Sequence, residues 1–181
     1  AIDSDFHLVL NPDAYLQKES LCVALNFLKD NHCAVLAGFQ GFTEKGDPAF
    51  LSKRYPSLFI FLLRAIESLF KLRFFNSYLN HYEYRDLSQQ EPNEVELVSG
   101  CAMLARSDIL KKVGGFDERF FLYFEDFDLS LRLSEYGKIF SIPDAKLTHL
   151  GGNTPTKGIK KVTYFIKSAV TFFRLHRVSL F

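Results

Sequence analysis

The sequence predicts an α/β domain in which a mixed, mainly parallel sheet is flanked by helices. Two short apolar runs, Phe6–Leu10 and Cys33–Gly38, have the length and composition of buried strands. Between them, residues 15–30 repeat apolar side chains at helical spacing. A strand, a helix and a second strand form a βαβ unit, which places its two strands parallel in one sheet. The chain has 181 residues, 48% of them hydrophobic, which is enough for one domain with a substantial core.

Composition and charge narrow the class of protein. The formal net charge of +1 gives no basic excess, so we expect no nucleic-acid partner. The cysteines Cys22, Cys33 and Cys101 are odd in number and form no CxxC motif, which favours packed thiols in a reducing compartment. The opening AIDSDF shows no secretory signal, and a strand follows almost at once. We therefore expect that further residues precede this chain.

The first strand ends at a segment that carries polar side chains. Pro12 cannot continue a strand ladder and keeps Asn11 out of the helical region, so the strand stops there and presents Asn11 and Asp13. Ligands bind at the carboxyl ends of strands in open α/β sheets. Asp13 is also a preferred residue for capping the helix that follows. A ligand role and a capping role both remain open for Asp13.

The middle of the chain has less distinctive chemistry. Residues 39–56 have the glycine and proline content of a loop, and residues 76–93 have the polar composition of a long surface loop. Residues 57–75 predict an apolar helix that is interrupted by Arg64 and Glu67. Its uncharged run is shorter than the ~20 residues needed to cross a bilayer, so a core helix is favoured over one that leans on a membrane.

A further strand region is predicted over residues 94–104, with a break at Ser99 and Gly100. A glycine inside a strand indicates a bulge or a close approach of backbone or ligand. A short helix over residues 108–113 is expected to follow, ended by Gly114.

An aromatic run, residues 120–124, delivers three acids to the start of a helix predicted over residues 125–136. Asp128 precedes Arg132 by four residues, which is a favourable helix pair. Glu125 and Asp126 have no such partner. A helix start stabilises anions, whereas burial among aromatic rings would raise the pKa of a carboxyl group by desolvation. We predict that Asp126 is a general base.

The last part of the chain predicts two short strands and a helix. Residues 138–143 and 146–150 are the strands, joined by a Pro-Asp turn, and His149 ends the second. His149 is either a hydrogen-bonded core residue or a metal ligand. Residues 159–181 form a basic amphipathic helix, which either lies on an anionic membrane surface or docks on the domain with a solvated basic side.

Four segments together resemble family 2 glycosyltransferases of the GT-A fold, in particular the bacterial rhamnosyltransferase-like enzymes. The segments are LNPD (10–13), SGCAMLARSD (99–108), VGGFDERFFLYFEDFDLSLRL (113–133) and IPDAKLTHLGG (142–152). The resemblance implies that residues 1–152 are the C-terminal part of a Rossmann-like GT-A domain and that residues 153–181 are an added helix. The nucleotide-binding units that come first in the family are missing, so we expect little activity from this chain alone.

The resemblance also implies roles for individual residues. Asn11-Pro12-Asp13 matches the DxD motif with Asn at its first position, so Asp13 would bind Mg²⁺ or Mn²⁺ on the donor diphosphate. Glu125-Asp126 matches the ED motif, whose Asp is the base. His149 matches a histidine that completes the metal site in some relatives. A last group of residues in the matched segments is expected to bind substrate: Asn11, Ser99, Gly100 and Arg132.

The function implied is inverting transfer of a hexose such as rhamnose from a nucleoside diphosphate sugar to a hydroxyl of a glycan or lipid-linked acceptor in cell-surface polysaccharide synthesis. Such an enzyme would be cytoplasmic, at the inner face of the membrane. Two other functions remain open. One is a metal-dependent hydrolase built on Asp13, Asp126 and His149. The other is a non-catalytic module that docks on a membrane or partner through the helices at 57–75 and 159–181.

Overall fold

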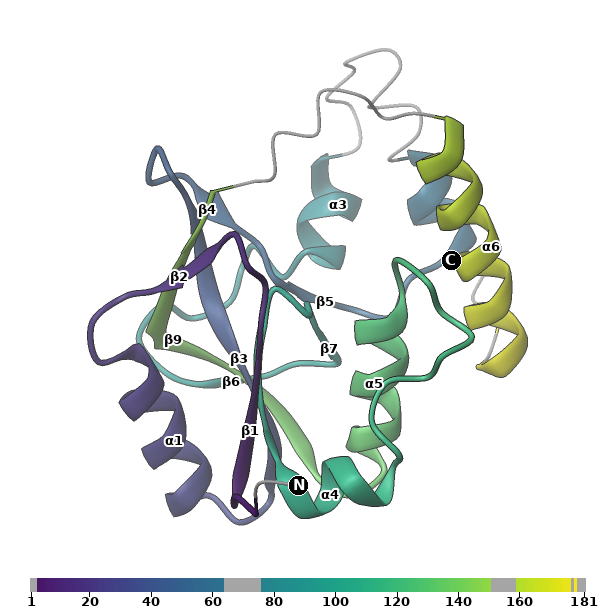
Figure 1. Ribbon diagram of the computed structural model, residues 1–181. Coiled ribbons are helices and arrows are strands. Elements are labelled where there is room, and N and C mark those ends of the chain that lie inside the picture. The colour runs from purple at the N-terminus through teal and green to yellow at the C-terminus, as the bar shows by residue number, and fades with distance from the viewer. Residues whose placement is uncertain (1–2, 64–75, 151–158, 177, 179–181) are drawn as a thin grey trace.

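The computed structural model describes residues 3–63, 76–150, 159–176 and 178 (Figure 1). The strands are β1 (Phe6–Leu10), β2 (Ala14–Leu16), β3 (Ala34–Thr43), β4 (Pro48–Ala49), β5 (Ser52–Lys53), β6 (Asn93–Glu94), β7 (Leu97–Val98), β8 (Ala102–Arg106) and β9 (Lys138–His149). The helices are α1 (Ser20–Asp30), α3 (Asn76–Tyr82), α4 (Ser107–Lys112), α5 (Glu125–Ser134) and α6 (Ile159–Leu175), and residues 58–63 are also helical.

The main sheet has seven strands, and most of its pairings are antiparallel. Its central order is β1-β8-β3-β9-β2, with β4 added to β3 and β6 added to β9. Of the pairings between described strands, only β3 with β9 is parallel. The prediction of an α/β fold with a mixed sheet is confirmed, but the expectation of a mainly parallel sheet is wrong.

The sheet is not mainly parallel because of β8, a strand from much later in the chain than β1 and β3. β1 and β3, on either side of α1, do run in the same direction. However, β8 lies between them and is antiparallel to both. A βαβ pattern fixes the relative direction of its two strands but does not exclude a third strand between them.

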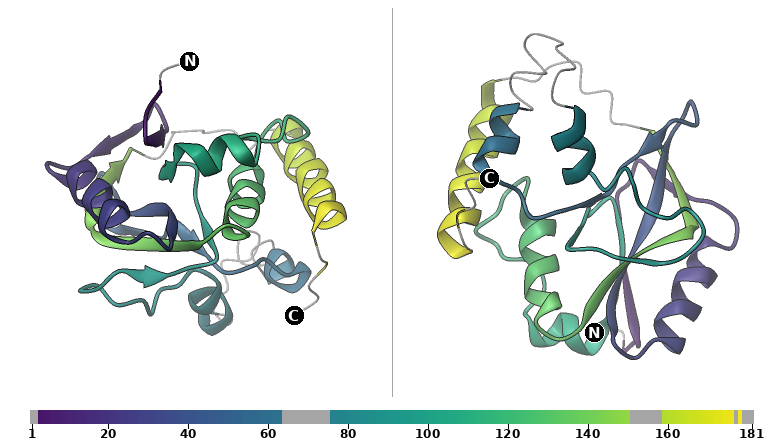
Figure 2. Two further views of the ribbon diagram at one scale, coloured as in Figure 1. Left: turned by 90° about the horizontal axis from the view of Figure 1, so that it is seen from below. Right: turned by 180° about the vertical axis from the view of Figure 1, so that it is seen from behind.

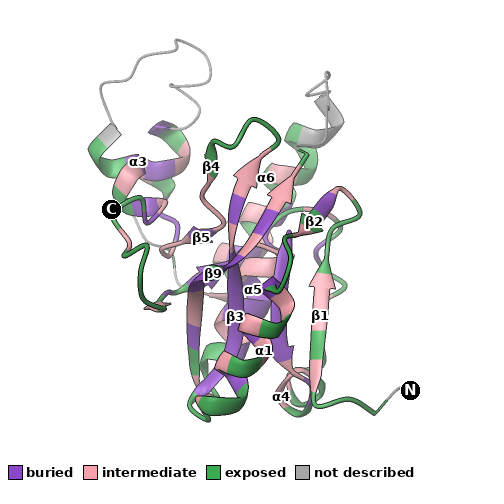
Figure 3. Cartoon of the chain, turned by 90° about the vertical axis from the view of Figure 1, so that its left-hand side faces the viewer, coloured by how far each residue is buried: buried purple, intermediate pink, exposed green. Residues whose placement is uncertain are grey.

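The two faces of the sheet carry separate cores. β8 alternates strictly: Ala102 and Leu104 pack on the side of α1, while Met103 and Ala105 pack on the side of α5. This two-residue period is the geometric property of a strand buried on both faces. The burial view shows β3 covered along most of its length (Figure 3). The helices therefore form a layer on each side of the sheet.

Several predicted boundaries differ from the structure. The predicted helix over 15–30 begins only at Ser20, because residues 14–16 form β2 and pair with β9. The two strands predicted around the Pro-Asp turn are one strand, β9, whose register shifts against β3 where the turn was expected. Residues 39–56 contain the end of β3 together with β4 and β5, and the expected loop at 76–93 begins as α3. Residues 64–75 and 151–158, on which parts of other predictions fall, lie outside the described residues.

The predicted helices over 108–113 and 125–136 are confirmed as α4 and α5, to within two residues at either end. Gly114 ends α4 as predicted, with a φ of +80° that disfavours other residues.

Helix α6 lies at the outer edge of the molecule, beyond α5 (Figures 1 and 2). Its inner face is docked: Phe172 is fully buried in a cluster with Phe120 and Phe124. The Ser168 hydroxyl also donates a hydrogen bond to the Leu122 carbonyl, at 2.8 Å. Docking, one of the two arrangements left open by the sequence, is therefore present. No helix within the described ranges is both long and apolar enough to cross a membrane.

Candidate active site

Glu125 and Asp126 lie in the first turn of α5. The backbone just before the helix has an unusual conformation. Tyr123 and Phe124, the two residues before the helix, both have left-handed backbones, with φ of 70° and 68°. For non-glycine residues such conformations cost on the order of 1–3 kcal/mol each and persist only when the surrounding structure holds them. Phe124 is buried against the rings of Phe165 and Phe172 of α6. Aromatic packing therefore holds the turn that presents the two acids.

The Asp126 carboxylate is held by backbone N–H groups. Oδ2 accepts a hydrogen bond from the Gly100 N–H, and Oδ1 accepts one from its neighbour Phe127, both at 2.9 Å. A side chain at position 100 would crowd this contact, since an added Cβ would lie 3.3 Å from the Asp126 Cβ. The glycine that broke the strand pattern thus allows the close approach expected of it, and the group that approaches is the carboxylate.

The electrostatics of Asp126 suit a proton acceptor. Burial raises the pKa of Asp126, and the hydrogen bonds from Gly100, Phe127 and Ser99 oppose the rise only in part. A carboxyl group that gains a proton more readily than usual is a stronger base in its ionised form. Ser130 fixes the same turn, because its hydroxyl donates to the Asp126 carbonyl at 2.8 Å and accepts the Val98 N–H at 3.2 Å.

Glu125 is the acid directly before Asp126 in α5. Burial raises the pKa of Glu125, and the charge of Asp126 adds to the rise. Its Oε2 atom is buried and has no hydrogen-bond partner among the described residues. Buried polar atoms are normally paired, so an unpaired oxygen here calls for an explanation. One explanation is that it accepts a hydrogen bond from a bound group.

Asp13 and His149 are brought together by strand pairing. β2 pairs with β9 so that Ala14 lies opposite His149, and the Leu150 N–H donates to the Asp13 carbonyl at 3.0 Å. The His149 Nε2 atom lies 3.3 Å from Asp13 Oδ1, and both side chains are partly exposed. Two residues that are 136 positions apart in the sequence (149 minus 13) therefore lie side by side in the structure.

Cys101 connects this pair to Asp126. Burial raises the pKa of the Cys101 thiol to about 11, and the charges of Asp13 and Asp126 both contribute. The backbone N–H of Asn11 donates to the Cys101 carbonyl at 2.9 Å. Asn11, Cys101 and the two acids thus belong to one neighbourhood. The sequence had indicated only a packed thiol at Cys101, although its position directly after Ser99 and Gly100 was a usable signal.

The metal prediction can be compared with the donors present. No group of three His, Cys, Asp or Glu side chains in the described part of the chain could hold a metal ion. Asp13 and His149 offer two ligands, one oxygen and one nitrogen. Mg²⁺ is often bound by one or two carboxylates with substrate phosphates and water as the remaining ligands. The pair therefore fits an ion shared with a diphosphate.

Arg132 lies in a structural network. Its guanidinium contacts Asp128 Oδ2 at 2.6 Å and donates to the Val113 carbonyl at 2.7 Å. Asp128 is buried, and its other oxygen lies 2.9 Å from Nε2 of His176, just beyond α6. The predicted helix pair of Asp128 and Arg132 is confirmed. Substrate binding by Arg132 stays a prediction, as it does for Asn11, Ser99 and Gly100.

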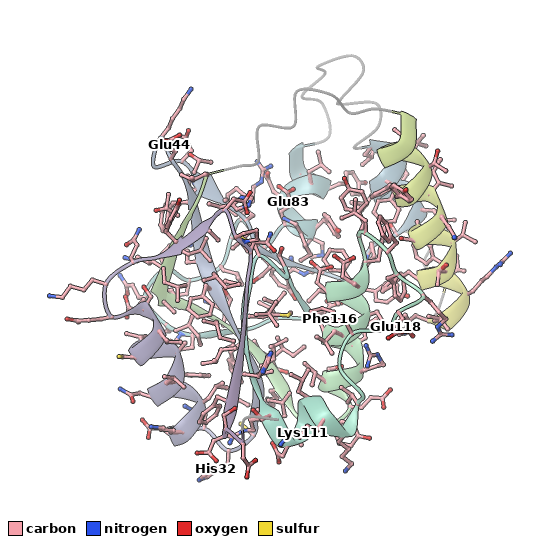
Figure 4. All side chains as sticks on the ribbon, in the orientation of Figure 1. His32, Glu44, Glu83, Lys111, Phe116 and Glu118 are labelled. Carbon is pink, nitrogen blue, oxygen red and sulfur yellow. The ribbon has the colours of Figure 1, made fainter. Side chains whose placement is uncertain are left out.

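The segment from α4 to α5 runs along the side of the molecule that faces α6, where Phe116 and Glu118 mark it (Figure 4). A separate cavity of about 380 Å³ lies between β3, β4 and residues 83–93. None of the predicted site residues lines this cavity. The candidate site lies between the ends of β1 and β9 and the start of α5.

Parts of the chain are similar in sequence to known proteins. The chain matches no protein-family model. A stretch of 62 residues, 33% of the chain, is 44% identical to N-acetylglucosaminyl-diphospho-decaprenol L-rhamnosyltransferase of Mycobacterium tuberculosis and covers 20% of that protein, in strain CDC 1551 and in strain H37Rv alike. A longer stretch of 137 residues, 75% of the chain, is 28% identical to rhamnosyltransferase WbbL of Escherichia coli K12 and covers 48% of it.

The chain thus spans about half or less of the length of these curated relatives. The resemblance to rhamnosyltransferases is confirmed as partial homology, and it supports the prediction of a glycosyltransferase. The mostly antiparallel sheet leaves the GT-A fold as a prediction.

Proposed function

We propose that this chain forms the base and metal-binding part of an inverting glycosyltransferase, one that moves a hexose from a nucleoside diphosphate sugar to a hydroxyl of a glycan or lipid-linked acceptor. The observation that carries the proposal is the Asp126 carboxylate, fixed by the Gly100 N–H in a setting that raises its pKa. The partial homology to rhamnosyltransferases points to sugar transfer as the reaction. Cell-surface polysaccharide synthesis at the cytoplasmic face of the membrane is the corresponding setting.

In this proposal Asp126 takes the proton of the acceptor hydroxyl. The acceptor oxygen forms a bond to the anomeric carbon as the bond from that carbon to the diphosphate oxygen breaks. The bonding electron pair leaves with the nucleoside diphosphate, and a single displacement of this kind inverts the anomeric carbon. Glu125 would accept a hydrogen bond from the acceptor through Oε2, which has no partner among the described residues. Ser99 and Gly100 act through Asp126, whose carboxylate they hold.

Asp13 and His149 would hold Mg²⁺ or Mn²⁺, which when bound neutralises charge on the departing diphosphate. Asn11, which directly follows β1, would bind the donor through its side-chain amide.

A thermal-shift titration with UDP, dTDP and GDP, each with and without Mn²⁺, tests the donor site. Specific ligands stabilise the folded state by an amount that grows with concentration over Kd. We expect the melting temperature to rise only when one of the nucleotides and Mn²⁺ are both present, and we expect His149→Ala to remove that rise. His81→Ala, in α3, is the matched control and should keep it.

A rise that survives in His149→Ala would contradict the metal assignment. Because the relatives are longer than this chain, the titration is also run on any longer form of the protein that its gene encodes. The absence of a shift in both forms would count against the transferase itself. Product analysis separates the hydrolase alternative, which would release free sugar in the absence of an acceptor.

The pH dependence of transfer tests the base. Asp126 acts in its ionised form, so activity is present above its pKa and is lost as the pH falls through it. Burial raises this pKa, so the acid limb of the rate profile should lie above ~4, the value of an ordinary Asp. The measurement is the transfer rate at saturating donor over a pH series. A profile that stays flat down to ordinary Asp values would contradict the role of Asp126.

A further inference from the structure

The outer face of α6 carries apolar side chains where a docked helix normally carries polar ones. Val162, Ile166 and Val170 follow one another at four-residue spacing, so they form a single ridge along the helix. They are 51%, 56% and 43% exposed, whereas Phe172 of the same helix is fully buried. A helix that is docked on one side and still apolar on the other has a second surface to cover.

The charges of α6 all have one sign. The helix contains four basic residues and no acidic ones; they are Lys160, Lys161, Lys167 and Arg174. Lys167 and Arg174 are exposed, and Arg174 continues the ridge four residues after Val170. Cationic side chains flanking an apolar ridge match an anionic surface into which the ridge can insert. A protein partner would have to combine the same acidic and apolar properties over one helix length.

We propose that the exposed ridge of α6, formed by Val162, Ile166 and Val170, docks on the surface of an anionic lipid bilayer. The helix lies in the interface plane, with the ridge in the headgroup region and the basic side chains on anionic headgroups. Since the inner face of α6 packs against Phe124, just before Glu125, docking brings the candidate site close to the bilayer surface. This inference does not depend on the transfer reaction, because it concerns lipid without any sugar acceptor.

The test is sedimentation of the 181-residue chain with vesicles of phosphatidylcholine alone or mixed with phosphatidylglycerol. We expect binding only to the mixed vesicles, and we expect high salt to weaken it. Lys167→Glu should lower the partition coefficient by about fivefold or more, since one basic residue near an anionic surface accounts for about that factor. Ile166→Asp should abolish most of the binding. Both side chains are exposed, so both variants should fold.

Matched controls make the test specific to this face. Lys29→Glu makes the same charge change on α1, and Tyr136→Asp adds an acid at an exposed aromatic residue beyond the end of α5; both should bind like the wild type. Three outcomes would overturn the proposal. The first is that the wild type fails to bind mixed vesicles, and the second is that Ile166→Asp binds as well as the wild type. The third is that the chain is a dimer that Ile166→Asp dissociates, which would assign the face to a second copy.

Discussion

Replacing Asp126 by Asn is expected to lower the transfer rate by about 10²–10⁴-fold while leaving nucleotide binding nearly unchanged. The amide keeps the size of the carboxylate and can still accept the Gly100 N–H through its oxygen. What it loses is the ability to take a proton from the acceptor hydroxyl. The loss should therefore appear in kcat rather than in the affinity for the donor. The measurement is a transfer assay under saturating donor, combined with the thermal-shift titration.

The controls for this variant separate charge from position. Asp108→Asn removes an acid that is exposed on α4 and should transfer like the wild type. The residual activity of Asp126→Asn should also lack the acid limb of the wild-type pH profile. If Asp126→Asn retains most of its kcat, or if it loses donor binding to the same extent as turnover, Asp126 is not the base.

Local sequence patterns were enough to predict several of the helices and strands near Asp126. β1, α4 and α5 were predicted because their signals are local, such as the apolar run of β1 with its stop at Pro12 and the end of α4 at Gly114. β2 was missed because its three residues become a strand only by pairing with β9, more than 130 positions away. The insertion of β8 between β1 and β3 was missed for the same reason, and with it the direction of most of the sheet.

The candidate site shows the same division between local and distant information. The residue types of Asp13, Asp126 and His149 suggested base and metal chemistry, and the structure brings Asp13 to His149. The hydrogen bond from Gly100 to Asp126 could not be derived from their spacing, because it depends on how β7 and α5 pack. The contact between Asp128 and His176 is likewise tertiary, since the sequence offered only the local partner Arg132.

Replacing Phe172 by Ala is expected to lower the free energy of unfolding by about 3–5 kcal/mol, the usual range for a fully buried phenylalanine. Phe172 is 0% exposed and contacts the rings of Tyr55, Phe124 and Phe127. Domains of this kind are stable by only about 5–15 kcal/mol, so the loss would be a large fraction of the total. Phe121→Ala removes the same side chain from a site that is 78% exposed, and it should change stability by less than about 1 kcal/mol. Urea denaturation of the two variants measures the difference.

Phe172→Ala also tests whether α6 holds the turn at Tyr123 and Phe124, which precedes Glu125 and Asp126. Tyr123 and Phe124 keep their strained left-handed backbones because Phe124 is packed against α6, and without Phe172 that packing is incomplete. The turn should then relax and carry Asp126 away from the Gly100 N–H. Hydrogen exchange under native conditions should speed up at Gly100 by a larger factor than at the amides of β8. Equal acceleration at both places would mean that Phe172 stabilises the whole domain without any special hold on the turn. A selective effect at Gly100 would identify α6 as the element that positions the base.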